Sequence, residues 1–295
     1  MVLVVSCAVA LVACAHGTPV VTDRGARPTV TTASVQPAGT STGDPAHPVG
    51  VVAIGHSGLT GFRSDPANPE DNAFANSWAT GTNPVVDSVF ARLRRALPET
   101  GDHVANTARN GARADALTYQ AQDALRIVPT PRLALVQIMD NDIRCDGTDP
   151  DHFAEFRAAV REAVAVLVTS SPRVTVVLVG GAGRPARYAA AIASLPTTPP
   201  DLVGSGPCAL FSANRVVNPS EVARLTGLMD AYEAELARAC AGIPQCHTDR
   251  GAAARVKDSL DGLGSDLGHQ SVLGHQRTAA AVWPEVARLL GLPAG

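Results

Sequence analysis

The chain has 295 residues and a mass of 30.3 kDa, enough to bury a sizeable core in one large domain or two small ones. Hydrophobic residues make up 45% and charged residues 17%, which excludes a wholly disordered chain. The formal net charge is −3 and aromatic residues make up only 4%, so we expect neither a basic surface for phosphates nor an aromatic platform for bases, and hence no nucleic-acid partner.

The first element expected along the chain is an export signal at residues 1–14. Residues 2–13 are almost wholly apolar, but they are fewer than the roughly 18 that span a bilayer, so they fit the apolar region of a signal peptide. Ala13 before Cys14 resembles a bacterial lipobox, in which the cysteine is lipidated. The alternative is an ordinary signal peptide cleaved near Ala13 or Ala15. Both predict an exported protein of the cell envelope or medium, touching a membrane only through an amino-terminal lipid anchor.

A flexible linker is expected at residues 15–48, which are rich in Thr, Pro, Gly, Ala and Ser and have no periodic apolar pattern. From 49 to 295, short apolar runs alternate with amphipathic stretches, which indicates one folded domain. Strands are predicted at 49–55, 103–108, 133–139, 174–180 and around 243–248. Helices are predicted at 85–97, 112–127, 149–170, 218–241 and 271–290.

Two of these helices have recognisable starts. Asp149 before Pro150 predicts an N-cap with proline at the first helical position. Asn218 followed by Glu221 predicts a capping box. The alternation of strands and helices predicts an α/β fold, a flavodoxin-like three-layer α/β/α sandwich with a central parallel sheet of about five strands. Such sheets bind ligands at the carboxyl ends of their strands, so the residues that follow each strand are the candidates for function.

Residues with chemical uses follow the first three predicted strands. Ser57 stands in a Gly-His-Ser-Gly turn after the first strand, where exposed amides favour a developing oxyanion, although a serine there can also be a helix cap. Gly111 follows the second strand and lets the backbone approach a ligand. Asn141 follows the third strand and can donate an amide hydrogen to a negatively charged oxygen. Each of the last two can equally be a turn residue.

A carboxylate and an imidazole precede the last predicted helix. Asp266 and His269 are three residues apart, on one turn of chain. A carboxylate so placed can hold the Nδ1–H of the imidazole and leave Nε2 to take a proton from a nucleophile.

In their order along the chain, these residues resemble the SGNH, or GDSL-type, hydrolases, and the resemblance covers about residues 49–290. It implies that Ser57 is the nucleophile, His269 the general base and Asp266 its orienting acid. It also implies an oxyanion hole made by the Ser57 amide, the Gly111 amide and the Asn141 side chain. The implied activity is carboxylic ester hydrolysis through an acyl-enzyme, with no cofactor and no metal. The stretch 266–274 is the most similar part.

The sequence departs from the family pattern at two positions. His56 stands where the family has the aspartate of Gly-Asp-Ser, and Met139 stands where it has the glycine of Gly-x-Asn-Asp. These departures motivate the alternative of a non-catalytic envelope binding protein on the same fold. The serine turn also resembles the Gly-x-Ser-x-Gly elbow of α/β-hydrolases, but residue 59 is leucine rather than glycine.

Four cysteines lie outside the expected export signal, namely Cys145, Cys208, Cys240 and Cys246. In an oxidising compartment this even number predicts two disulfides, for which three pairings exist. One of them joins Cys240 to Cys246 across a short loop and leaves Cys145 for Cys208. A metal site at Cys240, Cys246 and His247 lacks a Cys-x-x-Cys pair and a second half.

The substrate is expected to be a small-molecule or glycan ester. An insertion at residues 63–84 follows the candidate nucleophile and is expected to line the rim of its pocket. Its polar content, with Trp78 and few aliphatic residues, favours short acyl chains or carbohydrate O-acetyl groups over long lipid chains. A carbohydrate O-deacetylase acting on envelope glycans is therefore an alternative to a general esterase.

Overall fold

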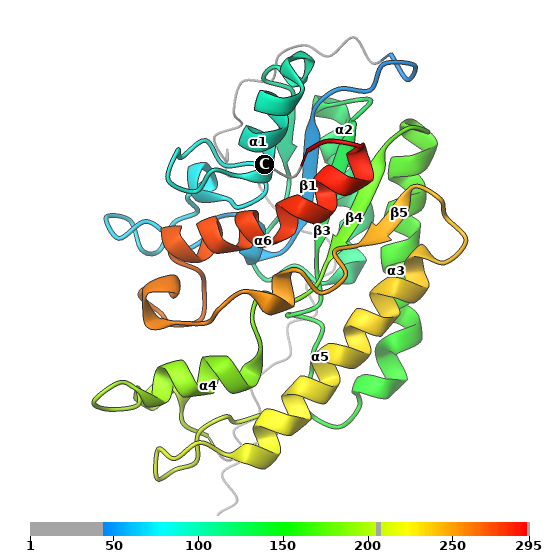
Figure 1. The fold of residues 1–295 in the computed structure, drawn as a ribbon. Helices are drawn as coiled ribbons and strands as arrows, with labels where there is room; N and C mark the ends of the chain where they lie inside the picture. Colours follow the sequence, from blue (N-terminus) through cyan, green and yellow to red (C-terminus); the bar gives the residue numbers. More distant parts are fainter. Residues whose placement is uncertain (1–43, 205–207, 294–295) are drawn as a thin grey trace, which may run out of the picture. The chain divides into compact units, whose positions relative to one another are not determined.

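The computed structural model describes residues 44–204 and 208–293 (Figure 1). The expected export signal with Cys14, and the expected linker up to residue 43, lie outside the described residues. Residues 44–48, assigned to the linker from composition, form turns tied to the domain, because Arg173 Nη1 donates to the Ala46 carbonyl at 2.7 Å and Pro48 is buried. Within the described part of the chain, no helix has the length and apolarity needed to cross a membrane.

Five parallel strands form one sheet in the order β2-β1-β3-β4-β5. This confirms the predicted sheet, and the order is that of flavodoxin-like folds, with β1 and β3 in the interior. β1 and β3 are buried along their whole lengths, which explains why both read as apolar runs, interrupted only by Gln137 at the end of β3. The strands are β1 (Val51–Gly55), β2 (Val104–Asn106), β3 (Leu133–Gln137), β4 (Thr175–Val179) and β5 (Cys246–Thr248).

Helices cover both faces of the sheet, which confirms the three-layer sandwich (Figure 1). On one face, side chains such as Val52 and Ile54 pack against α2, α3 and α5. On the other face, Val51 and Ala53 pack against α1 and α6. The helices are α1 (Val89–Ala96), α2 (Leu117–Ile127), α3 (Asp149–Ser170), α4 (Pro185–Ala193), α5 (Pro219–Cys240) and α6 (Val272–Leu290).

The structure moves the first of the two predicted helix starts by one residue and confirms the second at Asn218, without the predicted side-chain cap. Asp149 is the first residue of α3 rather than its cap, and its buried carboxylate accepts the amide hydrogens of Arg144 and Cys145 at 2.8 and 3.0 Å. Asn218 does precede α5, but its side chain makes no capping bond. Glu221 instead accepts the Cys208 amide at 2.7 Å. In both cases the carboxylate accepts amide hydrogens from the preceding loop, and local sequence patterns do not predict such contacts.

Two disulfides are present, Cys145–Cys208 and Cys240–Cys246, which is one of the three pairings that the sequence leaves open. The first joins the loop after β3 to the segment before α5. The second joins the end of α5 to the start of β5. The first disulfide therefore fastens an irregular segment to the loop that carries Asn141.

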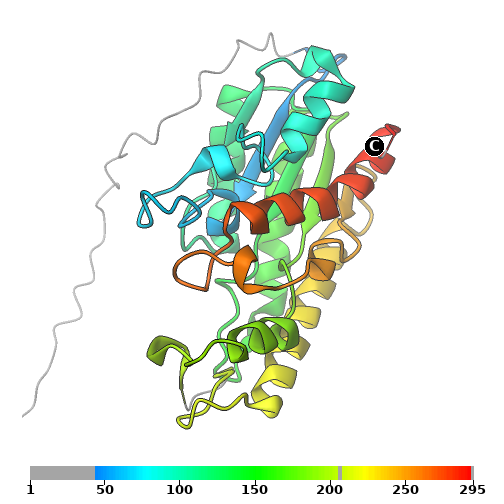
Figure 2. The same cartoon turned by 60° about the vertical axis from the view of Figure 1, so that its left-hand side comes forward.

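That irregular segment contains α4, and we call residues 181–204 and 208–218 the α4 segment. Figure 2 shows α4 beyond the carboxyl ends of the strands, apart from the two helical layers and beside the amino-terminal half of α5. A separate apolar cluster, built on Ile192 and Phe211, packs here against Leu263 and Leu267. The α4 segment therefore supports the loop that precedes α6.

Candidate active site

Ser57 lies just past the carboxyl end of β1, on a short 3₁₀ turn, Ser57–Leu59. Gly55 ends the strand with φ of +144°, and a Cβ there would lie 1.8 Å from the Gln137 carbonyl oxygen, so only glycine fits. His56 caps the turn, because its Nδ1 accepts the Gly58 amide at 3.0 Å. These two residues turn the chain so that Ser57 stands at the edge of the sheet.

A buried glutamine holds the residue before this turn. The Gln120 side chain accepts the Gly55 amide at 2.6 Å and donates to the Gly55 carbonyl at 3.0 Å. Gln120 comes from α2, 65 residues away along the chain. Gln120 was not among the predicted site residues, because a position on the buried face of a helix is the only sign of this role in the sequence.

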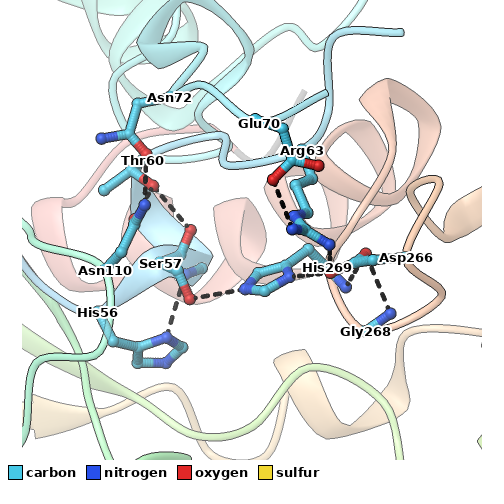
Figure 3. A network of polar contacts seen from close by, with 11 residues as sticks. His56, Ser57, Thr60, Arg63, Glu70, Asn72, Asn110, Asp266, Gly268 and His269 are labelled. Atoms are coloured by element: carbon cyan, nitrogen blue, oxygen red, sulfur yellow. Dashed lines mark hydrogen bonds and ion pairs between the residues drawn. The ribbon is translucent and has the colours of Figure 1, made fainter. Parts of the chain in front are cut away.

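The structure brings Ser57, His269 and Asp266 into one line of contacts (Figure 3). His269 Nε2 lies 3.0 Å from Ser57 Oγ, and His269 Nδ1 lies 2.6 Å from Asp266 Oδ2. An ionised carboxylate only accepts hydrogen bonds, so Nδ1 carries the proton and donates to Asp266. Nε2 is then free to accept the hydroxyl hydrogen of Ser57.

The turn that carries the carboxylate also fixes its direction. Asp266 Oδ1 accepts the amide hydrogens of Gly268 and His269 at 3.1 and 3.0 Å. Burial alone would raise the pKa of Asp266, but the hydrogen bonds from the His269 ring and amide outweigh it and lower the pKa below its ordinary value. Asp266 is therefore ionised at neutral pH, as a group that orients an imidazole must be.

Two residues of the segment after Ser57 pack against this pair and were not expected from the sequence. The Phe62 and His269 rings form a T-shaped pair with a centroid distance of 4.9 Å and an interplanar angle of 86°. Arg63 Nη1 lies 3.5 Å from Asp266 Oδ2, while its Nη2 pairs with Glu70 at 2.7 Å (Figure 3). Phe62 therefore packs against the imidazole and Arg63 against the carboxylate.

Gly111 and Asn141 lie on neighbouring loops at the same edge of the sheet. Gly111 has φ of +72°, and no atom lies within 4 Å of the place a Cβ would take, so its backbone faces open space. The Asn141 side chain donates to the Ala112 carbonyl at 3.0 Å, which uses one of its two amide hydrogens. Within residues 44–204 and 208–293, the amides of Ser57 and Gly111 donate no hydrogen bond.

A chain of side chains joins the Ser57 turn to the Gly111 loop (Figure 3). Thr60 Oγ1 donates to Asn110 Oδ1 at 2.8 Å, and Asn110 Nδ2 donates to Asn72 Oδ1 at 2.8 Å. The Ser57 carbonyl accepts from the Thr60 hydroxyl at 3.1 Å. Three backbone segments are thus held in a fixed relation around the serine.

The two departures from the family pattern lie beside this site. His56 is buried, its pKa is lowered by that burial, and its Nε2 lies 3.2 Å from Asp140 Oδ2 outside hydrogen-bonding geometry. Met139 has φ of +145°, a conformation that favours glycine. The backbone before Asn141 therefore follows the course that a glycine would give, although the residue is methionine.

Asp142 lies next to Asn141 on the loop after β3. Its Oδ1 accepts the Ala114 amide at 3.1 Å, and its Oδ2 is buried without a hydrogen-bond partner among the described residues. Burial raises the pKa of Asp142 to about 6. With the Asn141 bond to Ala112, this contact ties the loop after β3 to the loop that carries Gly111.

The insertion at residues 63–84 contributes Arg63 to the surroundings of Asp266, but Trp78 does not line a pocket. Trp78 is 0% exposed and donates from Nε1 to Gln137 Oε1 at 3.0 Å within the core. Trp78 therefore belongs to the core rather than to the rim that the insertion was expected to form, because Gln137 gives its indole nitrogen a buried partner. Among the described residues, no three His, Cys, Asp or Glu side chains gather as metal ligands.

No protein-family model matches the sequence, and no curated protein matches it. Solved structures do resemble it. An extracellular lipase from Streptomyces rimosus is 15% identical with a TM-score of 0.50, and the match covers 79% of this chain and 97% of the lipase. A Bacillus subtilis protein is 14% identical with a TM-score of 0.50, covering 84% of this chain and 58% of that one.

A family two carbohydrate esterase from Clostridium thermocellum, in complex with cellohexaose, is 14% identical with a TM-score of 0.49. The match covers 83% of this chain and 66% of the esterase, slightly less than two thirds of its length. At such identities the similarity concerns the fold. The chain has the fold of the SGNH hydrolases, as its sequence predicted.

Proposed function

We propose that this protein is an exported serine esterase that hydrolyses carboxylic esters through Ser57, His269 and Asp266. The observation that carries the proposal is the unbroken line of contacts from Asp266 Oδ2 to His269 Nδ1 at 2.6 Å and from His269 Nε2 to Ser57 Oγ at 3.0 Å. A non-catalytic binding protein would have no need to keep a hydroxyl, an imidazole and a carboxylate in this geometry.

The reaction follows from the direction of these hydrogen bonds. His269 Nε2 takes the hydroxyl proton as Ser57 Oγ bonds to the ester carbonyl carbon, and the carbonyl oxygen becomes an oxyanion. The amides of Ser57 and Gly111 and the remaining Asn141 amide hydrogen are the candidate donors to that oxyanion. His269 then gives its proton to the leaving alcohol oxygen as the carbon–oxygen bond breaks. A water molecule deprotonated by His269 hydrolyses the acyl-Ser57 ester and restores the enzyme.

Export is supported by the two disulfides, which persist in oxidising compartments. The lipid anchor at Cys14 is a proposal from the sequence, and it has its own test. Cell fractionation of the full chain should find the protein in the membrane fraction and its Cys14→Ser variant outside it. An unchanged distribution would dismiss the anchor without affecting the esterase.

The esterase proposal is tested with the full chain, a p-nitrophenyl ester and a fluorophosphonate probe. The unmodified protein should hydrolyse the ester and take up the probe, and Ser57→Ala should lose both. Ser170→Ala, at an exposed serine at the end of α3, is the matched control and should behave like the unmodified protein. Full hydrolysis by Ser57→Ala, or no labelling of the intact protein, would contradict the proposal.

A further inference from the structure

A cavity of about 340 Å³ opens beside His269. Its floor includes Gly181, just after β4, and its walls come from α5, the α4 segment and the loop before α6. His269 itself is part of the lining, so a group held in the cavity lies next to the reacting atoms. Its volume lies at the lower end of the range for small-molecule sites.

Hydrocarbon forms most of the cavity wall. The apolar side chains that line it are those of Pro185, Leu210, Leu225, Met229, Val256 and Leu263. These side chains gain free energy from contact with an apolar ligand. Ser259 and Gln270 also belong to the lining, but their side chains are already hydrogen-bonded to Asp261 and Thr278.

The buried charges at the cavity are paired with each other. Arg184 donates to both oxygens of Glu233 at 3.0 and 2.6 Å, and its backbone amide donates to Asp258 at 2.9 Å. Arg187 lies 3.6 Å from Asp258 and balances its remaining charge. Lys257 and Asp140 line the cavity as well, but both are exposed to solvent. The cavity therefore favours an uncharged occupant.

The strand order sets the cavity apart from two of the candidate oxyanion donors, the amides of Ser57 and Gly111. Gly111 follows β2 and Ser57 follows β1, whereas the cavity lies past β4 and reaches the loop after β3 at Asp140. With the oxyanion directed toward Gly111, the other two substituents of the tetrahedral carbon, the acyl chain and the leaving alcohol, are the ones that can extend toward β4.

We propose that the substrate is an ester with a linear hydrocarbon chain and that this chain occupies the cavity beside His269. The inference rests on the proposed esterase function and names its substrate class. It replaces the preference for acetyl groups that the polar insertion suggested, because the chain-binding wall is built by α5 and the α4 segment instead. The chain can belong to either side of the ester, and two substrate series separate these sources.

The first series is p-nitrophenyl esters with acyl chains of 2, 4, 8 and 12 carbons, and the second is acetate esters of straight-chain alcohols of the same lengths. In one series, kcat/KM should rise by about two- to fourfold per added methylene between 2 and 8 carbons, as burial of methylene groups requires. A rise with acyl length assigns the acyl chain to the cavity, and a rise with alcohol length assigns the alcohol. A flat response in both series, with acetate esters hydrolysed, would overturn the inference and leave the esterase intact.

A filled cavity supplies the matched test. Leu225→Trp adds bulk from α5 into the cavity, whereas Val216→Trp places the same indole at a side chain that is 62% exposed. In the series that responds to chain length, Leu225→Trp should lower the ratio of kcat/KM at 8 carbons to kcat/KM at 2 carbons by at least tenfold, and Val216→Trp should leave this ratio unchanged. An unaltered chain-length response in Leu225→Trp would refute the inference.

Binding can be measured independently of catalysis. Isothermal titration of decanol into Ser57→Ala should give binding that Leu225→Trp in the same background removes and Val216→Trp retains. If the unmodified protein hydrolyses no ester but this binding pattern holds, the esterase fails and the hydrocarbon site stands. If Ser57→Ala binds no decanol, the site itself is refuted.

Discussion

Asp266→Asn tests whether the carboxylate contributes charge and orientation to His269. In the proposed mechanism, the carboxylate stabilises the imidazolium that forms when His269 takes the serine proton. With the charge centres roughly 4 Å apart and an effective dielectric constant of about 20, that attraction is worth about 4 kcal/mol, or a factor of about 10³ in rate. Asparagine keeps the shape of the side chain but can also hold the ring in the wrong tautomer, so we expect kcat to fall by about 10³–10⁴.

The chain offers a matched control in a second aspartate near a second histidine. Asp140 Oδ2 lies 3.2 Å from His56 Nε2, but its side chain is 45% exposed, against 15% for Asp266. Solvent screens Asp140, and His56 holds the Gly58 amide rather than the Ser57 hydroxyl, so Asp140→Asn should lower kcat by less than tenfold. Steady-state hydrolysis of one p-nitrophenyl ester by both variants decides the matter. Equal losses, or an Asp266→Asn variant with more than a tenth of the original kcat, would refute the assignment.

Three further predictions concern the loop after β3. Asn141→Ala should lower turnover by about 10²–10³ with fluorophosphonate labelling still detectable, and turnover within threefold of the original would remove Asn141 from the oxyanion hole. For Asp142 the pKa is raised to about 6 from 3.8, so between these pH values the native state holds more protons than the unfolded state, and the free energy of unfolding falls as pH rises. In urea unfolding at pH 7.5, Asp142→Asn should therefore be more stable than the unmodified protein by up to about 3 kcal/mol. The fall in its free energy of unfolding between pH 4 and pH 6 should also be absent. A variant less stable than the unmodified protein would contradict the predicted direction. Replacing Cys145 and Cys208 by alanine removes a cross-link between residues 63 apart and should lower the free energy of unfolding by about 4 kcal/mol in the same assay. Replacing the two cysteines of the disulfide that spans 6 residues should lower it by about 2 kcal/mol. Equal losses would argue against loop closure as the main source of the stabilisation.

The sheet and the placement of the site could be predicted because both follow from local patterns and topology. Apolar runs, interrupted only by Gln137 in β3, identify β1 and β3, which are buried on both faces. Once the strands are parallel, residues that follow them must meet at one edge, and so Ser57, Gly111 and Asn141 could be chosen together. The Asp-x-x-His spacing then supplied the remaining two side chains.

The contacts that support the site could not be predicted, because they join segments far apart in the chain. The Gln120 clamp on Gly55 spans 65 residues, and the meeting of Arg63 with Asp266 spans about three times as many. Glu221 illustrates the opposite error. Its local sequence pattern is that of a capping box, but in the structure its carboxylate accepts the Cys208 amide hydrogen instead. The cavity wall was missed for the same reason, because α5 and the α4 segment approach His269 only in the folded chain.

Met139 explains how a motif can lose its glycine while its geometry persists. A non-glycine residue at φ of +145° is strained by about 1–3 kcal/mol. The Met139 side chain is 1% exposed, and burying a methionine contributes about 1.5–3 kcal/mol, so packing offsets the strain. Its methyl group fills space beside Gly181, where an added Cβ would come within 2.9 Å of it. The hydrogen bonds from Asn141 to Ala112 and from Ala114 to Asp142 then hold the loop in a backbone conformation that a methionine at position 139 would not favour by itself.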